Sequence, residues 1–457
     1  MARPRKNAAK VQGSLLAPDE VAEIPVEEQP YPLPEGWKWA YWGSCGDFIA
    51  GNAFKPDFQG KKGLLYPFYK VGSLKFSDNK GYLYDIEHSI SEETQKSIKS
   101  SIIPEHSIIF AKIGEAIRLN RRSINEKKCC IDNNLMAFVP QKTTYKYVYY
   151  WSLGIDLYKY TNATTVPAIR KTDLEKIVFP LPPLDEQQRI VDRIESFFAK
   201  LDDAKAKAEA VLDGFEIRKA AILHKAFTGE LTERWREENK IQISSWKEES
   251  ITSLCHSLKY GTAKKSKEIG STVVLRMGNL QDGEIDWSNL AYSDDQDDIQ
   301  KYLLFPNDVL FNRTNSSELV GKTAIYRGEY PAIYAGYLIK MNYKKNRLTG
   351  PYLNYVMNSH KAKEYCNNVK SDGVNQSNIN AKKLGAFVIS VPSLPEQQEI
   401  VRILDNLLAK ERHIREAAEN ALSQIGLMKK AILARAFRGE LGTHGSARDT
   451  LQNNGSM

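Results

Sequence analysis

A short polar segment in the second half of the chain carries side chains well suited to hydrogen-bonding with nucleic acid. It runs Asn312-Arg313-Thr314-Asn315. A forked guanidinium can donate to guanine edges or to phosphate, and short amides and hydroxyls can reach adenine edges or the DNA backbone. The other interpretation is a polar surface loop whose arginine pairs with a nearby carboxylate. A matching basic residue, Lys112, in the first half supports DNA contact, and both interpretations stay open.

Further basic and amide side chains are candidates for DNA contacts. In the first half we expect phosphate contacts, or alternatively a solvated face, for Lys112, Arg118, Arg121 and Arg122. In the second half the additional candidates are Lys264, Lys265, Arg276, Asn279 and Lys322. A loop with Asn375, Gln376 and Asn378 is rich in hydrogen-bonding groups, and its plainest interpretation is a long connection.

The common enzyme motifs are missing from the sequence. Gly321-Lys322-Thr323 imitates the end of a phosphate-binding loop, but Ser316 stands where that motif requires glycine. There is no GxGxxG, HExxH or GxSxG, and no Asn/Asp-Pro-Pro-aromatic tetrapeptide of the kind that amino-methyltransferases use. We therefore expect no catalytic residue, no cofactor and no metal ion on this chain.

Cysteine usage and hydropathy bear on the compartment. The five cysteines form no CxxC pair and have no histidine at zinc spacing, so they should be reduced and structural. No apolar run is long enough for a signal peptide or a membrane span, which predicts a cytoplasmic protein. The net charge of +8 permits a polyanionic partner but does not require one.

A duplicated segment provides the frame that must position these residues. The segment from Pro183 to Leu231 returns from Ser393 to Leu441, 210 residues later, with 20 of 49 positions identical and no gap. Its start reads LDEQQ from Leu184 and LPEQQ from Leu394. Such agreement indicates an internal duplication.

Apolar residues inside each copy follow the heptad spacing of a coiled coil, interrupted in the second copy by Glu411. The predicted seam is Ile190, Ile194, Phe197, Leu201, Val211, Phe215, Ile400, Leu404, Leu407, Ile414, Ile425 and Met428. Ser393 with Glu396 predicts a capping box, and Gly229 and Gly439 predict helix C-caps. Each helix should have about 40 residues and a length of roughly 60 Å.

A stripe this long and narrow needs an equally long partner. We expect the two copies to pair with each other within one chain, because closing a loop costs less than forming a dimer. The alternative is that each helix pairs with the same helix of a second chain.

The segments before the two helices resemble each other in outline only. Trp37-Lys38 corresponds to Trp246-Lys247, and residues 108–112 correspond to 309–313. In both segments, short β-rich runs lead to a helical stretch, expected over 147–158 and 351–365, and then to a polar loop and a strand. The chain therefore reads as globule, long helix, globule, long helix.

Three motifs make the chain resemble the specificity (S) subunits of type I restriction-modification enzymes. Residues 306–321 are similar to a target recognition domain signature, and 182–188 and 434–441 to the central and distal conserved regions of that family. The resemblance covers roughly Leu33 to Leu441. Residues 111–115 depart from the fuller pattern at Asn312 to Asn315.

The resemblance implies an α/β (α+β) fold. Two mixed target recognition domains would be separated by two long conserved helices forming an antiparallel coiled coil, as a pseudo-two-fold internal repeat. With the polar chain ends, the expected organisation is a disordered N-terminal tail (1–31), target recognition domain 1 (32–181), a central conserved helical region (182–240), target recognition domain 2 (241–391), a distal conserved helical region (392–442) and a disordered C-terminal tail (443–457).

The resemblance also implies a function. Each domain would read one half of a bipartite, asymmetric site in double-stranded DNA, and loops like the one holding Asn375 approach DNA in the family. The helices would set the spacer and dock two methyltransferase (M) subunits, which restriction (R) subunits then join. S-adenosylmethionine, ATP and Mg²⁺ are expected on those partners, which would carry the adenine-N6 methyltransferase and ATP-dependent endonuclease activities in a prokaryotic cytoplasm.

Two alternatives to this function remain. One is the specificity subunit of a related type IIB or IIG system, in which methylase and nuclease are fused in the partner. The other is a structural adaptor whose helices scaffold a complex without reading sequence. Two diversified globules on one repeated frame argue against the adaptor.

Overall fold

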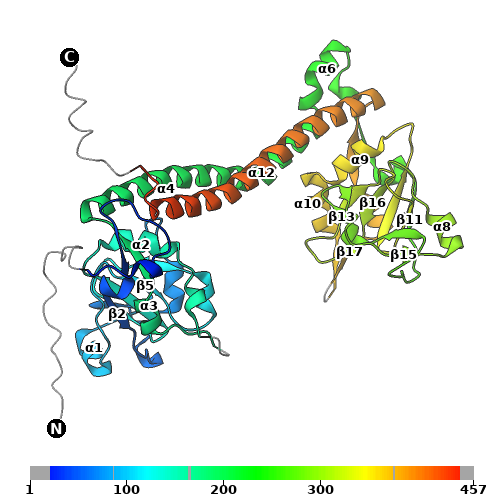
Figure 1. The fold of residues 1–457 in the computed structure, drawn as a ribbon. Helices are drawn as coiled ribbons and strands as arrows, with labels where there is room; N and C mark the ends of the chain where they lie inside the picture. The colour runs from blue at the N-terminus through cyan, green and yellow to red at the C-terminus, as the bar shows by residue number, and fades with distance from the viewer. Residues whose placement is uncertain (1–20, 86, 163–165, 374–375, 443–457) are drawn as a thin grey trace, which may run out of the picture. The chain divides into compact units, whose positions relative to one another are not determined.

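The computed structural model describes residues 21–85, 87–162, 166–373 and 376–442, which divide into two compact units. The first unit comprises the residues up to Lys207 and those from Ala421 onward, and the second comprises Ala208–Asn420. Each unit combines one globule with the beginning of one long helical segment and the end of the other (Figure 1).

The globule of the first unit is built on an antiparallel four-stranded sheet of order β2-β8-β5-β6. Its central strands β5 and β8 are buried almost throughout, as expected of continuous apolar runs. Two smaller sheets, β4-β3-β7 and β1-β9, complete the globule. The strands are β1 (Lys38–Tyr41), β2 (Gly46–Ala50), β3 (Tyr66–Tyr69), β4 (Ser89–Ile90), β5 (Ile108–Ala111), β6 (Arg122–Ile124), β7 (Cys130–Ile131), β8 (Leu135–Pro140) and β9 (Val178–Leu181).

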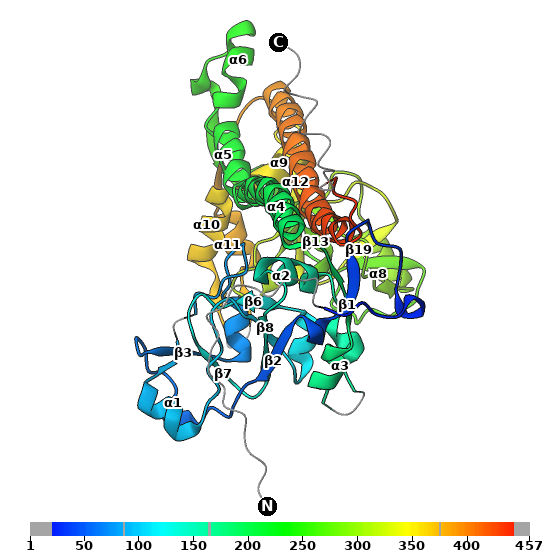
Figure 2. The same cartoon turned by 60° about the vertical axis from the view of Figure 1, so that its left-hand side comes forward.

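Three short helices accompany these sheets, namely α1 (Glu92–Ile98), α2 (Tyr145–Leu153) and α3 (Lys171–Glu175). Helix α2 lies between the four-stranded sheet and the long helix α4 (Figure 2). The rings of Tyr150 and Phe198 meet there at 5.8 Å, and Lys146 pairs with Glu195 at 2.8 Å. The helix expected over 147–158 is shorter, because Gly154 caps it and a separate 3₁₀ turn follows.

The globule of the second unit repeats this topology strand for strand. The order β11-β20-β16-β18 matches β2-β8-β5-β6, while β15-β12-β19 and β10-β23 match the smaller sheets. Two further sheets, β13-β14 and β17-β22-β21, are added. The strands are β10 (Lys247–Ser250), β11 (Cys255–Tyr260), β12 (Thr272–Leu275), β13 (Leu280–Gln281), β14 (Glu284–Ile285), β15 (Tyr292–Ser293), β16 (Val309–Asn312), β17 (Thr314–Asn315), β18 (Thr323–Ile325), β19 (Ala332–Tyr334), β20 (Leu338–Tyr343), β21 (Ser371–Asp372), β22 (Ser377–Asn378) and β23 (Val388–Val391).

The stretch expected to be one helix over 351–365 is two helices, because the Ser359 hydroxyl accepts a bond from the Ala362 amide and begins a second one. The short helices of this unit are α6 (Glu233–Glu238), α7 (Ile251–Leu254), α8 (Gln296–Tyr302), α9 (Gly350–Met357), α10 (His360–Val369) and α11 (Ala381–Gly385).

The repeated glutamine explains why both long helices begin with the same motif. Gln187 is fully buried; its Oε1 accepts bonds from the Thr144 amide and the Thr143 hydroxyl, both at 2.9 Å. Its counterpart Gln397 is also fully buried and accepts a bond from the Thr349 amide at 2.9 Å. Each glutamine therefore fixes the start of a long helix to the start of α2 or α9.

The long helices differ in continuity. Helix α12 (Leu394–Ala436) runs for 43 residues without a break, whereas the first copy is divided at Gly214 into α4 (Leu184–Asp213) and α5 (Phe215–Phe227). Only Gly214 separates the two segments, so the first copy is one long helix with a bend, and the expected length of about 40 residues is confirmed. The Arg218 guanidinium folds back over Gly214, where a Cβ would lie 2.5 Å from it, and its Nη2 donates to the Val211 carbonyl at 3.0 Å.

In each unit an ion pair joins the two copies. In the first unit, Lys429 donates to Asp202 at 2.5 Å, and in the second, Arg218 donates to Glu411 at 2.8 Å. Residue numbers fall along α12 as they rise along α4 and α5, so the copies pair antiparallel within one chain.

The buried residues of the helices match the predicted seam only in part: Phe215 and Ile425 are buried as predicted. Ile190, Ile194, Ile400 and Leu404 are fully buried, but they pack against the globules. Phe198 and Leu408 are buried where Phe197 and Leu407 were expected. Ile414 and Met428 are 46% and 49% exposed. Phe198 is buried because its ring meets Tyr150 of the first globule, 5.8 Å between centroids, whereas Phe197 lines the groove between the two helices.

The helix ends follow most of the expected signals. The Ser393 hydroxyl accepts a bond from the Glu396 amide at 3.4 Å, but the Glu396 side chain points to other partners, so only half of the capping box forms. Gly229 and Gly439 both have positive φ, as expected of C-cap glycines.

Part of the expected N-terminal tail is packed. Val21 and Ile24 are buried, and the Tyr31 hydroxyl donates to the Phe437 carbonyl at 2.9 Å. Residues 1–20, and the expected C-terminal tail at 443–457, lie outside the described residues.

Candidate nucleic-acid interface

Arg313 stands immediately after β16, at the point where the chain leaves the four-stranded sheet. Its amide donates to the Tyr337 carbonyl at 3.0 Å, and its carbonyl accepts from the Ile379 amide at 2.9 Å. The half-buried guanidinium lies over the Tyr260 ring, 4.9 Å from its centroid. The backbone and the ring together fix both ends of this side chain.

The polar residues around Arg313 form a short hairpin edge. Strand β17 pairs with β22, and Asn378 donates through Nδ2 to the Thr314 hydroxyl at 2.8 Å. Asn315 is half-buried, and Gln376 is exposed at the hairpin tip. Asn375 lies outside the described residues. The structure therefore brings Arg313, Thr314, Asn315 and Asn378 together in one patch.

Lys112 occupies the same place in the first globule. Its amide donates to the Asn134 carbonyl at 2.8 Å, and its carbonyl accepts from the Ile169 amide at 2.9 Å, which matches the bonding of Arg313. The residue at the position of Tyr260 is Ala50. Ala50 pairs with Met136 of β8, and Tyr260 pairs with Ile339 of β20. Met136 and Ile339 are equivalent because they pair with the same positions of β5 and β16. The frame is the same, and the side chains on it differ.

The other basic residues of the first globule have unlike environments. Arg121 is exposed. Arg118 lies over the Tyr158 ring at 3.8 Å and is paired with Glu115 at 2.6 Å. Arg122 is 5% exposed and donates to the Asn120 side chain at 2.9 Å and to the Ile155 carbonyl at 3.0 Å. Arg122 therefore holds the fold and is not available at the surface.

Two predicted amides of the second globule are also interior. Asn279 is 2% exposed, and its Nδ2 donates to the Asp286 and Asn289 carbonyls. Asn312 is fully buried, and its Oδ1 accepts from the Thr314 amide at 3.2 Å. These side chains shape the loops that carry their neighbours.

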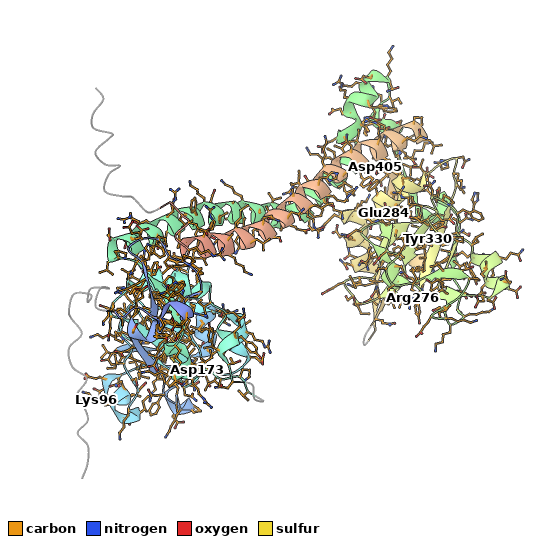
Figure 3. All side chains as sticks on the ribbon, viewed as in Figure 1. Lys96, Asp173, Arg276, Glu284, Tyr330 and Asp405 are labelled. Carbon is orange, nitrogen blue, oxygen red and sulfur yellow. The ribbon has the colours of Figure 1, made fainter. Side chains whose placement is uncertain are left out.

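The remaining predicted cations of the second globule are at the surface. Lys264 pairs with Asp295 at 2.6 Å, and this carboxylate raises the pKa of the Lys264 ammonium. Lys265 is exposed, and Lys322 donates to Gln281 at 2.7 Å. Arg276 donates to Asn289 at 3.0 Å. It lies on the side of its globule opposite to α12, the helix that carries Asp405 (Figure 3).

The sequence did not point to three aromatic residues beside these cations. Tyr260 is 38% exposed and Tyr337 is 51% exposed. The ring of Tyr158 contacts Arg118. Tyr260 lies at the end of a strand far from Arg313 in the sequence, so only the β11-β20-β16 pairing reveals their proximity. The one signal that could have pointed to Tyr260 is an exposed tyrosine at the end of a strand.

The first unit also has an apolar groove between α4 and α12, with a volume of about 370 Å³. It is lined by Phe197, Leu201, Met428, Ala431 and Ile432, with Lys200 and Arg435 at the same groove. At the corresponding place in the second unit, Glu411 and Arg218 stand where Leu201 and Met428 stand here.

The described ranges hold neither a membrane-spanning helix nor a metal-binding cluster. None of the helices there is long and apolar enough to cross a membrane. No group of three or more histidine, cysteine, aspartate or glutamate residues among the same residues is placed to hold a metal ion.

Comparison with known proteins identifies the family. The model of the type I restriction modification DNA specificity domain matches residues 34–212 and again 243–423. The chain is 25% identical over 426 residues to the specificity subunit of the type I restriction enzyme EcoKI of Escherichia coli strain K12, covering 90% of each chain. It is 28% identical to the StySPI specificity subunit of Salmonella potsdam, over 60% of this chain and 59% of that one.

Solved structures agree on the fold. The crystal structure of the HsdS subunit from Thermoanaerobacter tengcongensis matches 91% of this chain and all of that one, with a TM-score of 0.61 and 17% identity. A chain from a study of complex assembly in the type I R-M system matches 90% of this chain and all of that one, with a TM-score of 0.69 and 17% identity. With two matched domains and the repeated fold, this chain belongs to the family of type I restriction-modification DNA specificity subunits.

Proposed function

We propose that the two globules are target recognition domains, each reading one half of a bipartite, asymmetric site in double-stranded DNA. The observation that carries this proposal is the pair Lys112 and Arg313, which occupy one backbone position in two topologically identical domains. A shared frame with different side chains places two readers alike and gives them different base preferences.

The proposed readers are the surface residues of each domain. In the second domain they are Arg313, Asn315, Gln376 and Asn378, together with Asn375, with Lys264, Lys265, Arg276 and Lys322 as phosphate contacts. Thr314 is 6% exposed and supports Asn378 through its hydroxyl. In the first domain they are Lys112, Arg118 and Arg121. Arg122, Asn279 and Asn312 are left out of the interface because their side chains are buried.

The long helices are proposed to set the spacing between half-sites. Antiparallel pairing of α4 and α5 with α12 is supported by one ion pair in each unit, Asp202 with Lys429 and Glu411 with Arg218. A helix rises about 1.5 Å per residue, so the length of the paired region determines how far apart its two ends lie.

The catalytic activities are proposed to belong to partners. Two methyltransferase subunits would dock on the helical regions, and the apolar groove beside Leu201 and Met428 offers one surface for such contact. S-adenosylmethionine would bind those subunits, and ATP and Mg²⁺ would bind the restriction subunits. The chain would work in a prokaryotic cytoplasm.

Co-expression tests this proposal. The chain is expressed with a methyltransferase subunit encoded beside it, and methyladenine in the host genome is mapped by single-molecule sequencing. We expect methyladenine confined to one split, asymmetric motif, and its loss when this chain is deleted. Methylation that is unaffected by the deletion would contradict the proposal and favour a scaffolding role.

A further inference from the structure

Arg313 is held in place before any ligand arrives. Its guanidinium lies 4.9 Å from the centre of the Tyr260 ring, and its Nη1 is 3.5 Å from the Gly336 carbonyl. Stacking on an aromatic face and a backbone contact restrict a side chain that otherwise has many rotamers. Less conformational entropy is therefore lost when it binds.

Tyr260 is itself fixed. It ends strand β11, where it pairs with Ile339 of β20. Its hydroxyl oxygen accepts a hydrogen bond from the Ala381 amide, at the start of α11, at 2.9 Å. The ring is thus anchored at its backbone and at its tip, and 38% of the residue is exposed.

The guanidinium retains donors for a ligand. Its Nε is enclosed and so is not open to a ligand, but Nη2 is neither enclosed nor hydrogen-bonded among the residues that the structure describes. Within the same residues, the only hydrogen bond that the side chain makes is the long one from Nη1. An arginine with unused, coplanar N–H groups matches the O6 and N7 acceptors of guanine in the major groove.

We propose that Tyr260 positions Arg313 as a rigid reader of guanine in the half-site of the second domain. The inference rests on the proposed function, because it names the base that one domain recognises. Arg313 is the residue that touches the base, and Tyr260 acts through it.

The first domain lacks this device. Ala50 stands at the position of Tyr260, so Lys112 has no ring beneath it at the equivalent place. A control comes from outside the proposed interface: Arg327 of the second domain pairs with Glu284 at 2.8 Å. Arg327 is an arginine of the same domain whose charge is already paired and which the proposed function does not use.

The test compares Tyr260→Ala, Tyr260→Phe, Arg313→Lys and Arg327→Lys in the full chain co-expressed with the methyltransferase subunit. Methylated motifs are mapped and ranked by the fraction of each site modified. We expect Tyr260→Ala and Arg313→Lys to relax the preference for guanine at one position of one half-site, by on the order of tenfold to a hundredfold. The other half-site should be unchanged.

The two remaining variants separate positioning from simple stability. Tyr260→Phe keeps the ring and should retain the motif, and Arg327→Lys should leave the base preferences unchanged. If Tyr260→Ala and Arg313→Lys lower methylation at all sites with the motif intact, Arg313 contacts phosphate or supports the fold, and the inference is overturned.

A motif with no guanine in one half-site would also overturn the inference, while leaving the proposed function standing. If the unaltered chain does not direct methylation to any split motif, the proposed function itself is contradicted, and the inference falls with it. Purified full chain provides a second readout: Arg313→Lys should weaken binding to a cognate duplex more than to one with that guanine replaced. Equal weakening of both duplexes would overturn the inference.

Discussion

Arg218 Nε lies 2.8 Å from Glu411 Oε2, and both residues stand at heptad positions of their helices. Glu411 looks like an interruption in the sequence of the second copy, yet Arg218 follows Phe215 by three residues and fills the matching place in the first. A single charged pair in an apolar seam favours one register and one partner over the alternatives.

Replacing one member of this pair should lower the free energy of unfolding more than replacing both. We expect Glu411→Leu alone to lower the free energy of unfolding by roughly 1–2 kcal/mol, because Arg218 would be left half-buried without its carboxylate. The double variant Arg218→Met/Glu411→Leu copies the Leu201 and Met428 pair of the other unit and should recover most of that loss. Urea denaturation measures both.

The exposed pair Arg415 and Glu419, 48% and 51% exposed, provides the control for this comparison. Glu419→Ala should change stability by less than about 0.5 kcal/mol. A double variant no more stable than Glu411→Leu would argue against the charged pair as a replaceable element of the seam.

A second ion pair is buried at the start of α12. Glu396 accepts from Arg236 and the Thr232 hydroxyl, each at 2.8 Å, and from the Trp246 indole at 2.9 Å. Its side chain is 0% exposed and that of Arg236 is 9% exposed. Glu396→Ala should therefore destabilise the protein by about 3–5 kcal/mol, since Arg236 would keep an unpaired buried charge.

Glu399, one turn further along α12, is the matched control. It pairs with Arg402, whose side chain is 66% exposed. Glu399→Ala should lower the midpoint of thermal unfolding far less than Glu396→Ala does, because exposed pairs contribute about 0–1 kcal/mol. Equal effects of the two variants would show that the Glu396 cluster is not a stabilising anchor.

Much of the fold was predictable from local patterns, and the limits of that prediction are physical. The repeat located both long helices, because the same apolar spacing and the same C-cap glycine act within each copy. The bend at Gly214 was not predicted because the heptad spacing continues through it; there Arg218 bonds back to the Val211 carbonyl. Arg122 and Asn312 were assigned to the surface by residue type alone, although tertiary packing buries them.

The candidate site shows the same division. Arg313 and Lys112 could be matched by counting along two similar strands, and the structure gives them equivalent backbone bonds. Tyr260 could not be matched to Arg313, because a neighbouring strand contributes it. Periodicity carries information about one element, whereas this contact depends on how strands are ordered.

Buried cysteines make stability depend on pH in the alkaline range. Burial raises the pKa of Cys45, Cys255 and Cys366 to about 11. The unfolded thiols begin to ionise near their ordinary pKa of 9.0, while the folded ones stay protonated. The free energy of unfolding is therefore unaffected by these thiols below about pH 9. It falls as pH rises toward 11, by up to roughly 2–3 kcal/mol for each thiol.

Urea denaturation between pH 8 and pH 10.5 checks this expectation. The triple variant Cys45→Ala/Cys255→Ala/Cys366→Ala should show a weaker decline, from a lower starting stability. In the native protein at pH 8 these thiols should also react slowly with a thiol reagent, because each is buried. Identical pH profiles for the two proteins would rule out the cysteines as the cause.

The spacing role of the helices predicts a defined change in the DNA motif. One heptad inserted after Ala208 and another after Leu422, both between the two inter-helix ion pairs, would lengthen the paired region by about 10 Å. The spacer between half-sites should grow by about 3 base pairs, at about 3.4 Å per base pair. Motif mapping of this variant measures the spacer, and an unchanged spacer would contradict the proposal that the helices set the spacing between half-sites.

The most direct measurement of the central claim uses the repeat itself. A chimera in which residues 38–181 are replaced by a second copy of 247–391 would place the same reader at both ends of the frame. Expressed with the methyltransferase subunit, it should methylate a palindromic motif made of two inverted copies of one half-site, with the original spacer. Methylation of the original asymmetric motif by the chimera would contradict the claim that each domain reads its own half.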